Sequence, residues 1–208
     1  MKQHQEFDPL AKIYRDAQSK YLAPSGYDSH YFAKLKAEKL KEWLPQYLGY
    51  QPETILDFGC GDGVMVQAVQ SIYPTAKLYG VDPSSESIAV AQQNVPQATF
   101  LISGNDLADL SDNTFDVAYA AGVFHHIPFE HHEQYIKELY RVLKPNGVLI
   151  LFELNPINPG TRYIFRNNPL EFDAKLLTPW YAKQLVGKGY IRTIFYCFYP
   201  KVLSSLGW

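Results

Sequence analysis

Short apolar runs and longer amphipathic segments alternate through the middle of the chain. The runs that we predict to be strands are 55–58, 77–82, 98–102, 115–121 and 148–154. The segments that we predict to be helices, with apolar residues at helical spacing, are 64–73, 84–94 and 129–143. Turn-forming residues separate these elements, among them Pro74 and the run Lys144-Pro145-Asn146-Gly147. The alternation predicts one α/β domain with a mostly parallel sheet.

The two ends of the chain show further patterns. Residues 1–27 predict one helix followed by a loop, and Asp28 or Ser29 can cap a second helix that runs to about Tyr47. Near the other end, Thr178-Pro179 combines a capping residue with a first-turn proline, which predicts a helix that ends at 187–189. A β-branched and aromatic run at 190–199 predicts a further strand.

Between the fifth predicted strand and that last helix, the chain contains two Asn-Pro pairs, at 155–156 and 158–159. Proline has no N–H and restricts the residue before it, so we expect residues 153–162 to be extended and turning, and not helical. If the piece that follows is helical, Arg162 and Arg166 share one face of it. They could then hold an acidic substrate, although a surface ion pair is the commoner outcome.

The most informative stretch is a glycine-rich turn directly after the first predicted strand, at 57–63. Glycine at alternate positions permits positive φ and removes Cβ atoms that would hold a ligand away from the backbone. The free N–H groups of the following helix start face whatever lies over the turn, which indicates a nucleotide-type site. The spacing D-x-G-x-G-x-G does not fit the dinucleotide fingerprint, and no G-K-[ST] follows, which excludes a P-loop.

Composition narrows the choice further. The 208 residues carry a formal net charge of −2 and the pI is about 6.3, so nothing indicates a basic surface for nucleic acid. No apolar run has membrane-spanning length, and the first ten residues lack the apolar core of a signal peptide. Two cysteines far apart in sequence argue against a disulfide framework. We therefore expect a cytoplasmic protein.

Four stretches together resemble the class I S-adenosylmethionine-dependent methyltransferases. The run 57–63 (DFGCGDG) resembles motif I of the family, and Asp82 ends the second predicted strand where the family has a ribose-binding acid. The strand 115–121 followed by Val-Phe-His-His-Ile resembles the small-molecule branch, of the methyltransferase type 11/12 kind. The stretch 139–153 (LYRVLKPNGVLILFE) is similar to the region that follows in the family.

This resemblance implies an architecture. We expect a three-layer α/β/α Rossmann-like sheet, a helical lid over residues 1–50, and a cofactor-binding domain over 51–208 with a substrate-side insertion at about 154–178. Class I sheets end in a β-hairpin, but eight residues remain here after Pro200. An incomplete hairpin would leave an exposed sheet edge, through which a homodimer could form.

The resemblance also implies S-adenosylmethionine as the cofactor and S-adenosylhomocysteine as its product. Asp82 would accept hydrogen bonds from the ribose hydroxyls. Asp106 would receive the adenine amino group, with Asn105 as its rival, and Cys60 is interpreted as a small residue in a tight space. The residues expected to contact the cofactor are Asp57, Gly59, Cys60, Gly61, Gly63, Asp82, Pro83, Asn105, Asp106, Leu107, Ala121, Tyr31 and Lys36.

Methyl transfer needs mainly alignment and exclusion of water, with a base where the acceptor must lose a proton. His125 and His126 follow the fourth strand and are candidates for that base, because histidine titrates near neutral pH. The alternative is that one of them caps the next helix or packs beneath the cofactor. Glu153 ends the fifth strand at the same edge and completes the predicted catalytic set.

The other histidines and polar residues are not predicted to take part in catalysis. His131 and His132 are predicted to lie on the polar side of the following helix, in contact with solvent. No acidic or thiol residue lies at ligand spacing from the four histidines, so no metal is expected. Asn155 joins Arg162 and Arg166 as a predicted substrate contact.

Three classes of function remain open. The leading one is methyl transfer to a small-molecule acceptor, with O-methylation ahead of N- or C-methylation. An RNA or protein methyltransferase is the second, against which the neutral charge and the missing N-P-P-[YFW] motif argue. A catalytically silent protein that binds the cofactor is the third.

Overall fold

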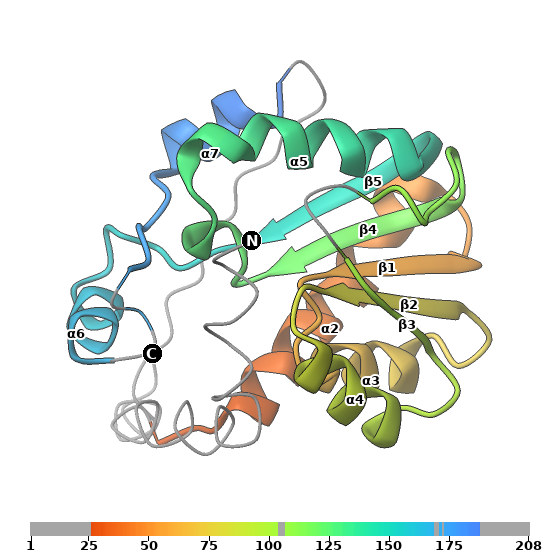
Figure 1. Ribbon diagram of the computed structural model, residues 1–208, viewed down its shortest axis with the longest axis horizontal. Coiled ribbons are helices and arrows are strands. Elements are labelled where there is room, and N and C mark those ends of the chain that lie inside the picture. The colour runs from red at the N-terminus through yellow and green to blue at the C-terminus, as the bar shows by residue number, and fades with distance from the viewer. Residues whose placement is uncertain (1–25, 104–106, 169–170, 172, 188–208) are drawn as a thin grey trace.

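The computed structural model describes residues 26–103, 107–168, 171 and 173–187 (Figure 1). Within them, five strands form one sheet in the order β3-β2-β1-β4-β5, and every neighbouring pair is parallel. The strands are β1 (Thr54–Phe58), β2 (Lys77–Asp82), β3 (Thr99–Ile102), β4 (Phe115–Ala121) and β5 (Leu143–Phe152). The helices are α2 (Ser29–Leu48), α3 (Val64–Ile72), α4 (Ser85–Asn94), the short 3-10 helix η4 (Phe124–His126), α5 (Phe129–Val142), α6 (Pro159–Asn167) and α7 (Pro179–Leu185).

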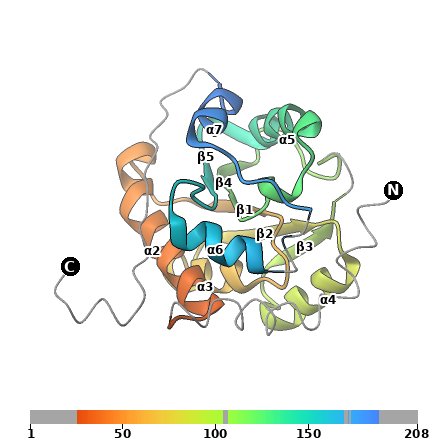
Figure 2. The same cartoon turned by 90° about the vertical axis from the view of Figure 1, so that its left-hand side faces the viewer.

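Helices cover both faces of the sheet. Figures 1 and 2 show α2, α3 and α4 on one face and α5, with α7 beside it, on the other. Two apolar clusters result, one built around Leu40, Val66 and Val117 and the other around Leu56 and Leu139. The expected three-layer α/β/α fold with a parallel sheet is therefore confirmed.

Local signals at the helix ends act as the sequence indicates. Asp28 caps α2 by accepting from the Tyr31 N–H at 2.8 Å, and Gly49 ends that helix with φ +73. Ser84 caps α4, and Thr178 caps α7 with Pro179 in its first turn. Each cap satisfies an N–H that the helix itself leaves without a partner.

Helix α2 is part of the packed structure. Leu40 and Leu44 on it are fully buried, and Trp43 stacks on Phe152 of β5 at 6.0 Å between ring centroids. A lid over residues 1–50 stays a prediction, because residues 1–25 lie outside the described residues. The strand predicted at 190–199 and the sheet edge that depends on it also lie outside them.

Two segments differ from the sequence-based expectation. Residues 159–167 form helix α6, which begins inside the stretch 153–162 that the Asn-Pro pairs led us to predict as not helical. Proline is tolerated at the first helical position, because the N–H it lacks would have no partner there anyway, and Asn158 caps the helix through the N–H groups of Gly160 and Thr161. Strand β5 begins at Leu143 and passes through the predicted break at 144–147 with an irregular register opposite β4.

His132 is a third correction. It is fully buried, not in contact with solvent, and its Nε2 lies 2.9 Å from the carbonyl oxygens of both Phe124 and Ile127. Its Nδ1 lies 3.0 Å from the Tyr181 hydroxyl on α7. His132 thus ties α5 to the segment that follows β4, and a buried ring with partners on both nitrogens is a structural element.

A buried carboxylate secures the amino end of the sheet. Asp116 on β4 accepts from the backbone N–H groups of Glu53 and Thr54, each at 2.9 Å, and from the Tyr50 hydroxyl at 3.0 Å. Lys144 of β5 donates to it at 2.8 Å. Burial would raise the pKa of Asp116, but these hydrogen bonds outweigh burial and lower it to about 2. The charged carboxylate therefore joins β1, β4 and β5.

We expect Asp116→Ala to lower the free energy of unfolding by about 3 kcal/mol at pH 7, because buried N–H groups lose their acceptor. Since the folded pKa lies below the ordinary value of 3.8, this contribution is present above about pH 4 and is lost as the pH falls toward 2. Urea denaturation measures the loss. Asp112→Ala is the matched control, because its carboxylate is 65% exposed in its ion pair with Arg141 and should cost less than about 1 kcal/mol. Equal losses in the two variants would contradict the assignment.

Candidate active site

The strand order defines where a ligand can bind. From β1 the chain continues to β2 and β3 on one side, and it returns to β4 and β5 on the other. In open α/β sheets, ligands bind at the carboxyl edge where the strand order reverses, here between β1 and β4. Figure 2 looks onto that edge, and α6 crosses in front of it.

The glycine turn after β1 is shaped by contacts on one side and open space on the other. Gly59, Gly61 and Gly63 all have positive φ, at +75, +52 and +80. A Cβ atom on Gly59 would lie 2.5 Å from Val123 Cγ2, so the turn packs directly against the segment after β4. A Cβ on Gly61 would meet nothing within 4 Å. The turn therefore has the close approach and the open side that a backbone cradle for a ligand needs.

Asp82 lies at the end of β2 beside this turn. Its carboxylate accepts from the Gly61 N–H and from the Ser84 N–H, both at 2.9 Å. A carboxylate offers about four acceptor positions, so it can still bind hydroxyl groups. Cys60 is buried, and burial raises the pKa of its thiol well above the ordinary value, which agrees with a packing role and not with a nucleophile.

Asp57, near the end of β1, is unusual because its carboxyl group is buried without a hydrogen-bond partner among the described residues. Its side chain is 1% exposed, and neither carboxylate oxygen has a hydrogen-bond partner among the described residues. Burial raises its pKa to about 8, while the Tyr119 hydroxyl and the Lys36 ammonium oppose the shift. A buried acid without a partner costs stability and is favoured when a cationic or hydrogen-bonding ligand completes it.

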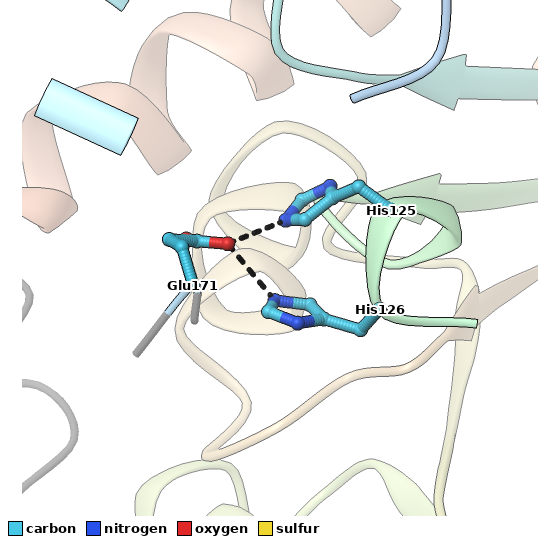
Figure 3. A group of neighbouring side chains, drawn as sticks. All are labelled: His125, His126 and Glu171. Carbon is cyan, nitrogen blue, oxygen red and sulfur yellow. Dashed lines mark ion pairs between the residues drawn. The ribbon is translucent and has the colours of Figure 1, made fainter. Parts of the chain in front are cut away.

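A cluster of four polar side chains lies on the other side of the switch point. We call Glu153, His125, His126 and Glu171 the polar cluster. Glu153 Oε1 accepts from the N–H groups of Val123 and Phe124, at 3.1 and 2.8 Å, and its Oε2 lies 2.6 Å from His125 Nδ1. On the far side, Glu171 Oε2 lies 3.3 Å from His125 Nε2 and 3.6 Å from His126 Nε2 (Figure 3).

The pKa values of the two neighbouring histidines are shifted in opposite directions. Burial would lower the pKa of His125, but the carboxylates of Glu153 and Glu171 outweigh it and raise the pKa to about 9. For His126, burial and then the charge of His125 lower the pKa to about 4. At neutral pH His125 is therefore held as a cation between two anions, which suits a positioning role, and His126 keeps a neutral ring.

Glu171 is the member of the polar cluster that the sequence-based assignment missed. It lies 45 residues after His126 in the sequence, on no strand and in no motif. The backbone supplies a tie to the same place, because the Lys175 N–H donates to the His125 carbonyl oxygen at 2.8 Å. No local pattern marks Glu171, and it reaches the histidines because the segment after α6 folds back over the carboxyl edge.

The remaining predicted residues are distributed unevenly around the site. Lys36 lies close enough to Asp57 to lower its pKa, whereas Tyr31 is 40% exposed and stacks on Tyr27. Pro83 follows Asp82, and Ala121 ends β4, both half-buried. Leu107 is buried in the core under α5. Asn105 and Asp106 lie outside the described residues.

The predicted substrate residues lie along the segment that contains α6. Asn155 uses its side-chain oxygen to accept from the Ile157 N–H at 2.9 Å, which shapes the turn after β5. Arg162 and Arg166 are both on α6, four residues apart and exposed, and neither forms an ion pair with a described residue. The placement leaves their role as substrate contacts a prediction.

Comparisons with known proteins give this geometry a context. Residues 56–151 match the family model described as a methyltransferase domain. A trans-aconitate 2-methyltransferase of Variovorax paradoxus is 35% identical over 97 residues, which are 47% of this chain and 37% of that protein. A demethylmenaquinone methyltransferase of Chlorobaculum tepidum is 32% identical over 148 residues, 71% of this chain and 57% of that protein.

Solved structures share the fold. The plantazolicin methyltransferase BpumL, in complex with S-adenosylhomocysteine, superposes with a TM-score of 0.64 at 22% identity and covers 88% of this chain and 76% of that one. Residues 56–151 of the chain are thus similar to a methyltransferase domain, and the fold is one that solved methyltransferases share. The chain spans 37–57% of the length of the two curated relatives named above. Within the described residues, no helix combines the length and apolar character that crossing a membrane requires.

The residues present fit S-adenosylmethionine, the cofactor of the similar methyltransferases. The open side of Gly61 admits the ligand to the backbone, and Asp82 can accept hydrogen bonds from ribose hydroxyls. Asp57, which a cationic ligand would favour in its ionised form, can hold the cofactor's ammonium group, and Lys36 has the charge to hold its carboxylate. The cofactor, when bound, supplies an electrophilic methyl group; the chain supplies its orientation.

We expect Asp57→Asn to stabilise the free protein and to weaken cofactor binding. The folded pKa of Asp57, about 8, lies above the ordinary 3.8, so the folded state loses stability as the pH rises from about 4 to about 8. The variant escapes this loss, and its advantage should grow over that range by at most about 1.4 kcal/mol per pKa unit. Urea denaturation at pH 5 and pH 9 measures the stability, and calorimetry with S-adenosylmethionine measures the affinity.

Asp109→Asn is the matched control, because Asp109 is an exposed aspartate outside the predicted cofactor contacts. It should change neither quantity. An Asp57→Asn protein that is less stable than wild type at pH 9, or that binds the cofactor equally well, would show that Asp57 does not bind a cationic group of the cofactor.

Proposed function

We propose that the chain is an S-adenosylmethionine-dependent methyltransferase that acts on a small-molecule acceptor, with an oxygen atom as the favoured target. The observation that carries this proposal is the pairing of the glycine turn and the unpartnered Asp57 carboxylate with the polar cluster across the switch point. One half suits a charged nucleotide-like cofactor, and the other offers acid–base and hydrogen-bonding groups to an acceptor.

The relatives support a small acceptor. They include a trans-aconitate 2-methyltransferase, demethylmenaquinone methyltransferases and, in Mus musculus, a ubiquinone biosynthesis O-methyltransferase that is 32% identical over 109 residues. A net charge of −2 also gives the chain no electrostatic attraction for RNA. A small metabolite with a hydroxyl or carboxyl group is the class of acceptor that agrees with both.

The chain's own residues would divide the work. Asp82, Asp57 and Lys36 would hold the cofactor. Glu153 would hold the backbone at 123–124 and, through its contact with His125, position the acceptor side of the site. The neutral ring of His126 would contact the acceptor. Helix α6, which crosses the carboxyl edge in Figure 2, would limit the access of water and present Arg162 and Arg166 to an acidic acceptor.

We expect Asp82→Ala to weaken S-adenosylmethionine binding by about 10- to 100-fold, because hydrogen bonds to a charged group contribute about 1.5–3 kcal/mol. Calorimetry with S-adenosylmethionine and S-adenosylhomocysteine measures the change, and Asp109→Ala is the exposed control. Asp82→Asn keeps the shape and one acceptor oxygen, so it should lose less. An unchanged affinity in Asp82→Ala, with the far-UV circular dichroism of wild type, would refute the cofactor site.

A labelled-methyl assay on cell extracts, separated into lipid, polar-metabolite, RNA and protein fractions, tests the acceptor class. We expect the label in a lipid or polar-metabolite fraction, because the site is built from small acid–base groups at the edge of one domain. Label confined to RNA or protein would refute the small-molecule assignment. Tight cofactor binding with no label in any fraction would indicate a protein that binds the cofactor without catalysis.

A further inference from the structure

We propose that His125, His126 and Glu171 form a binding site for one divalent transition-metal ion of the zinc type. These residues come from two segments far apart in the sequence, and one ligand atom from each lies within 4.8 Å of the others. Figure 3 shows both rings directed at the same carboxylate oxygen. Two imidazoles and one carboxylate are a common protein ligand set for catalytic zinc.

The distances within the group fit metal ligands better than they fit hydrogen bonds. Charge-assisted N–H···O⁻ bonds measure about 2.7–2.9 Å, whereas Glu171 Oε2 lies 3.3 Å from His125 Nε2 and 3.6 Å from His126 Nε2. With metal–ligand bonds of about 2.0–2.2 Å, two ligands of a tetrahedral ion lie about 3.3–3.6 Å apart. Both distances from Glu171 Oε2 thus match the spacing of neighbouring ligands, and the three ligand atoms all lie within 4.8 Å of one another.

The Glu171 oxygen is also left unsatisfied by hydrogen bonds. Glu171 Oε2 is buried and accepts no hydrogen bond from a described residue. A buried carboxylate oxygen ordinarily has a donor or a cation as a partner. Here the nearest groups are the two ring nitrogens. A metal ion between them would displace the Nε2 proton of His125 to solvent and would coordinate all three atoms.

Glu153 supplies the outer support that metal-binding histidines generally have. Its Oε2 lies 2.6 Å from His125 Nδ1, which leaves the opposite ring nitrogen, Nε2, on the side of Glu171. Its other oxygen accepts from two backbone N–H groups, so the carboxylate is itself held in place. A carboxylate–histidine–metal arrangement of this kind orients the ring and raises its basicity.

The position of the site suggests what the ion would do. It lies on the segment after β4, at the edge where the acceptor would bind. Three protein ligands leave a position for an oxygen of water or of the acceptor, and an oxygen bound to such an ion releases its proton to solvent more readily. This consequence rests on the proposed methyl transfer, whereas binding of the ion does not.

The test uses the full chain without an affinity tag, stripped with a chelator and titrated with Zn²⁺ by calorimetry. We expect one ion per chain, and we expect Co²⁺ at the same stoichiometry to give the visible absorption of a low-symmetry site. Glu171→Gln and His126→Asn should each weaken Zn²⁺ binding at least tenfold. Glu153→Gln should weaken it by about 10- to 100-fold, as supporting carboxylates do.

Matched controls lie next to the proposed ligands. Asp173→Asn alters an exposed carboxylate two residues from Glu171, and His131→Asn alters an exposed histidine on α5, so both should bind Zn²⁺ as wild type does. The absence of stoichiometric binding, or binding that survives in Glu171→Gln, would overturn the proposal. Circular dichroism and thermal unfolding of every variant ensure that a lost site is not lost folding.

Calorimetry with S-adenosylmethionine on the same preparations separates this proposal from the proposed function. Cofactor binding without Zn²⁺ binding refutes the metal site and leaves the methyltransferase assignment intact. Zn²⁺ binding without cofactor binding supports the metal site and refutes the assignment.

Discussion

The close contact between the glycine turn after β1 and the segment after β4 is the constraint on which the site depends. Gly59 allows that contact, because any Cβ there would overlap Val123. Glu153 then holds the backbone of Val123 and Phe124 from β5, and through its second oxygen it orients His125. The position of the polar cluster relative to the cofactor side therefore follows from one steric fit and one carboxylate.

Two buried aspartates on neighbouring strands show how the same side chain serves stability at one edge of the sheet and binding at the other. Asp116, at the amino edge, is surrounded by donors and has a pKa of about 2. Asp57, at the carboxyl edge, has no hydrogen-bond partner among the described residues and a pKa of about 8. The difference is a matter of satisfied hydrogen bonds, and the unsatisfied carboxylate lies where a ligand would complete it.

Local sequence patterns, which span only a few residues, were enough to predict the fold and the glycine turn on the cofactor side of the site. Buried parallel strands are nearly continuous apolar runs, and the caps Asp28, Ser84 and Thr178 act through their own helices, so these elements could be predicted from local chemistry. Helix α6 was missed because a proline that breaks a helix interior is compatible with a helix start. His132 was misplaced because its burial depends on α7 and the segment after β4.

The sequence by itself determined the α/β class, the similarity of residues 56–151 to a methyltransferase domain and the glycine turn with Asp82, since each depends on residues close together in the chain. Only the tertiary structure decided which side chains contact His125 and His126. Glu171 carries no local signal, and it meets the two rings because the chain after α6 returns to the carboxyl edge. Side chains that meet because the chain turns back on itself have no characteristic spacing in the sequence. Acid–base or metal-binding groups of this kind can therefore be recognised only from the three-dimensional structure.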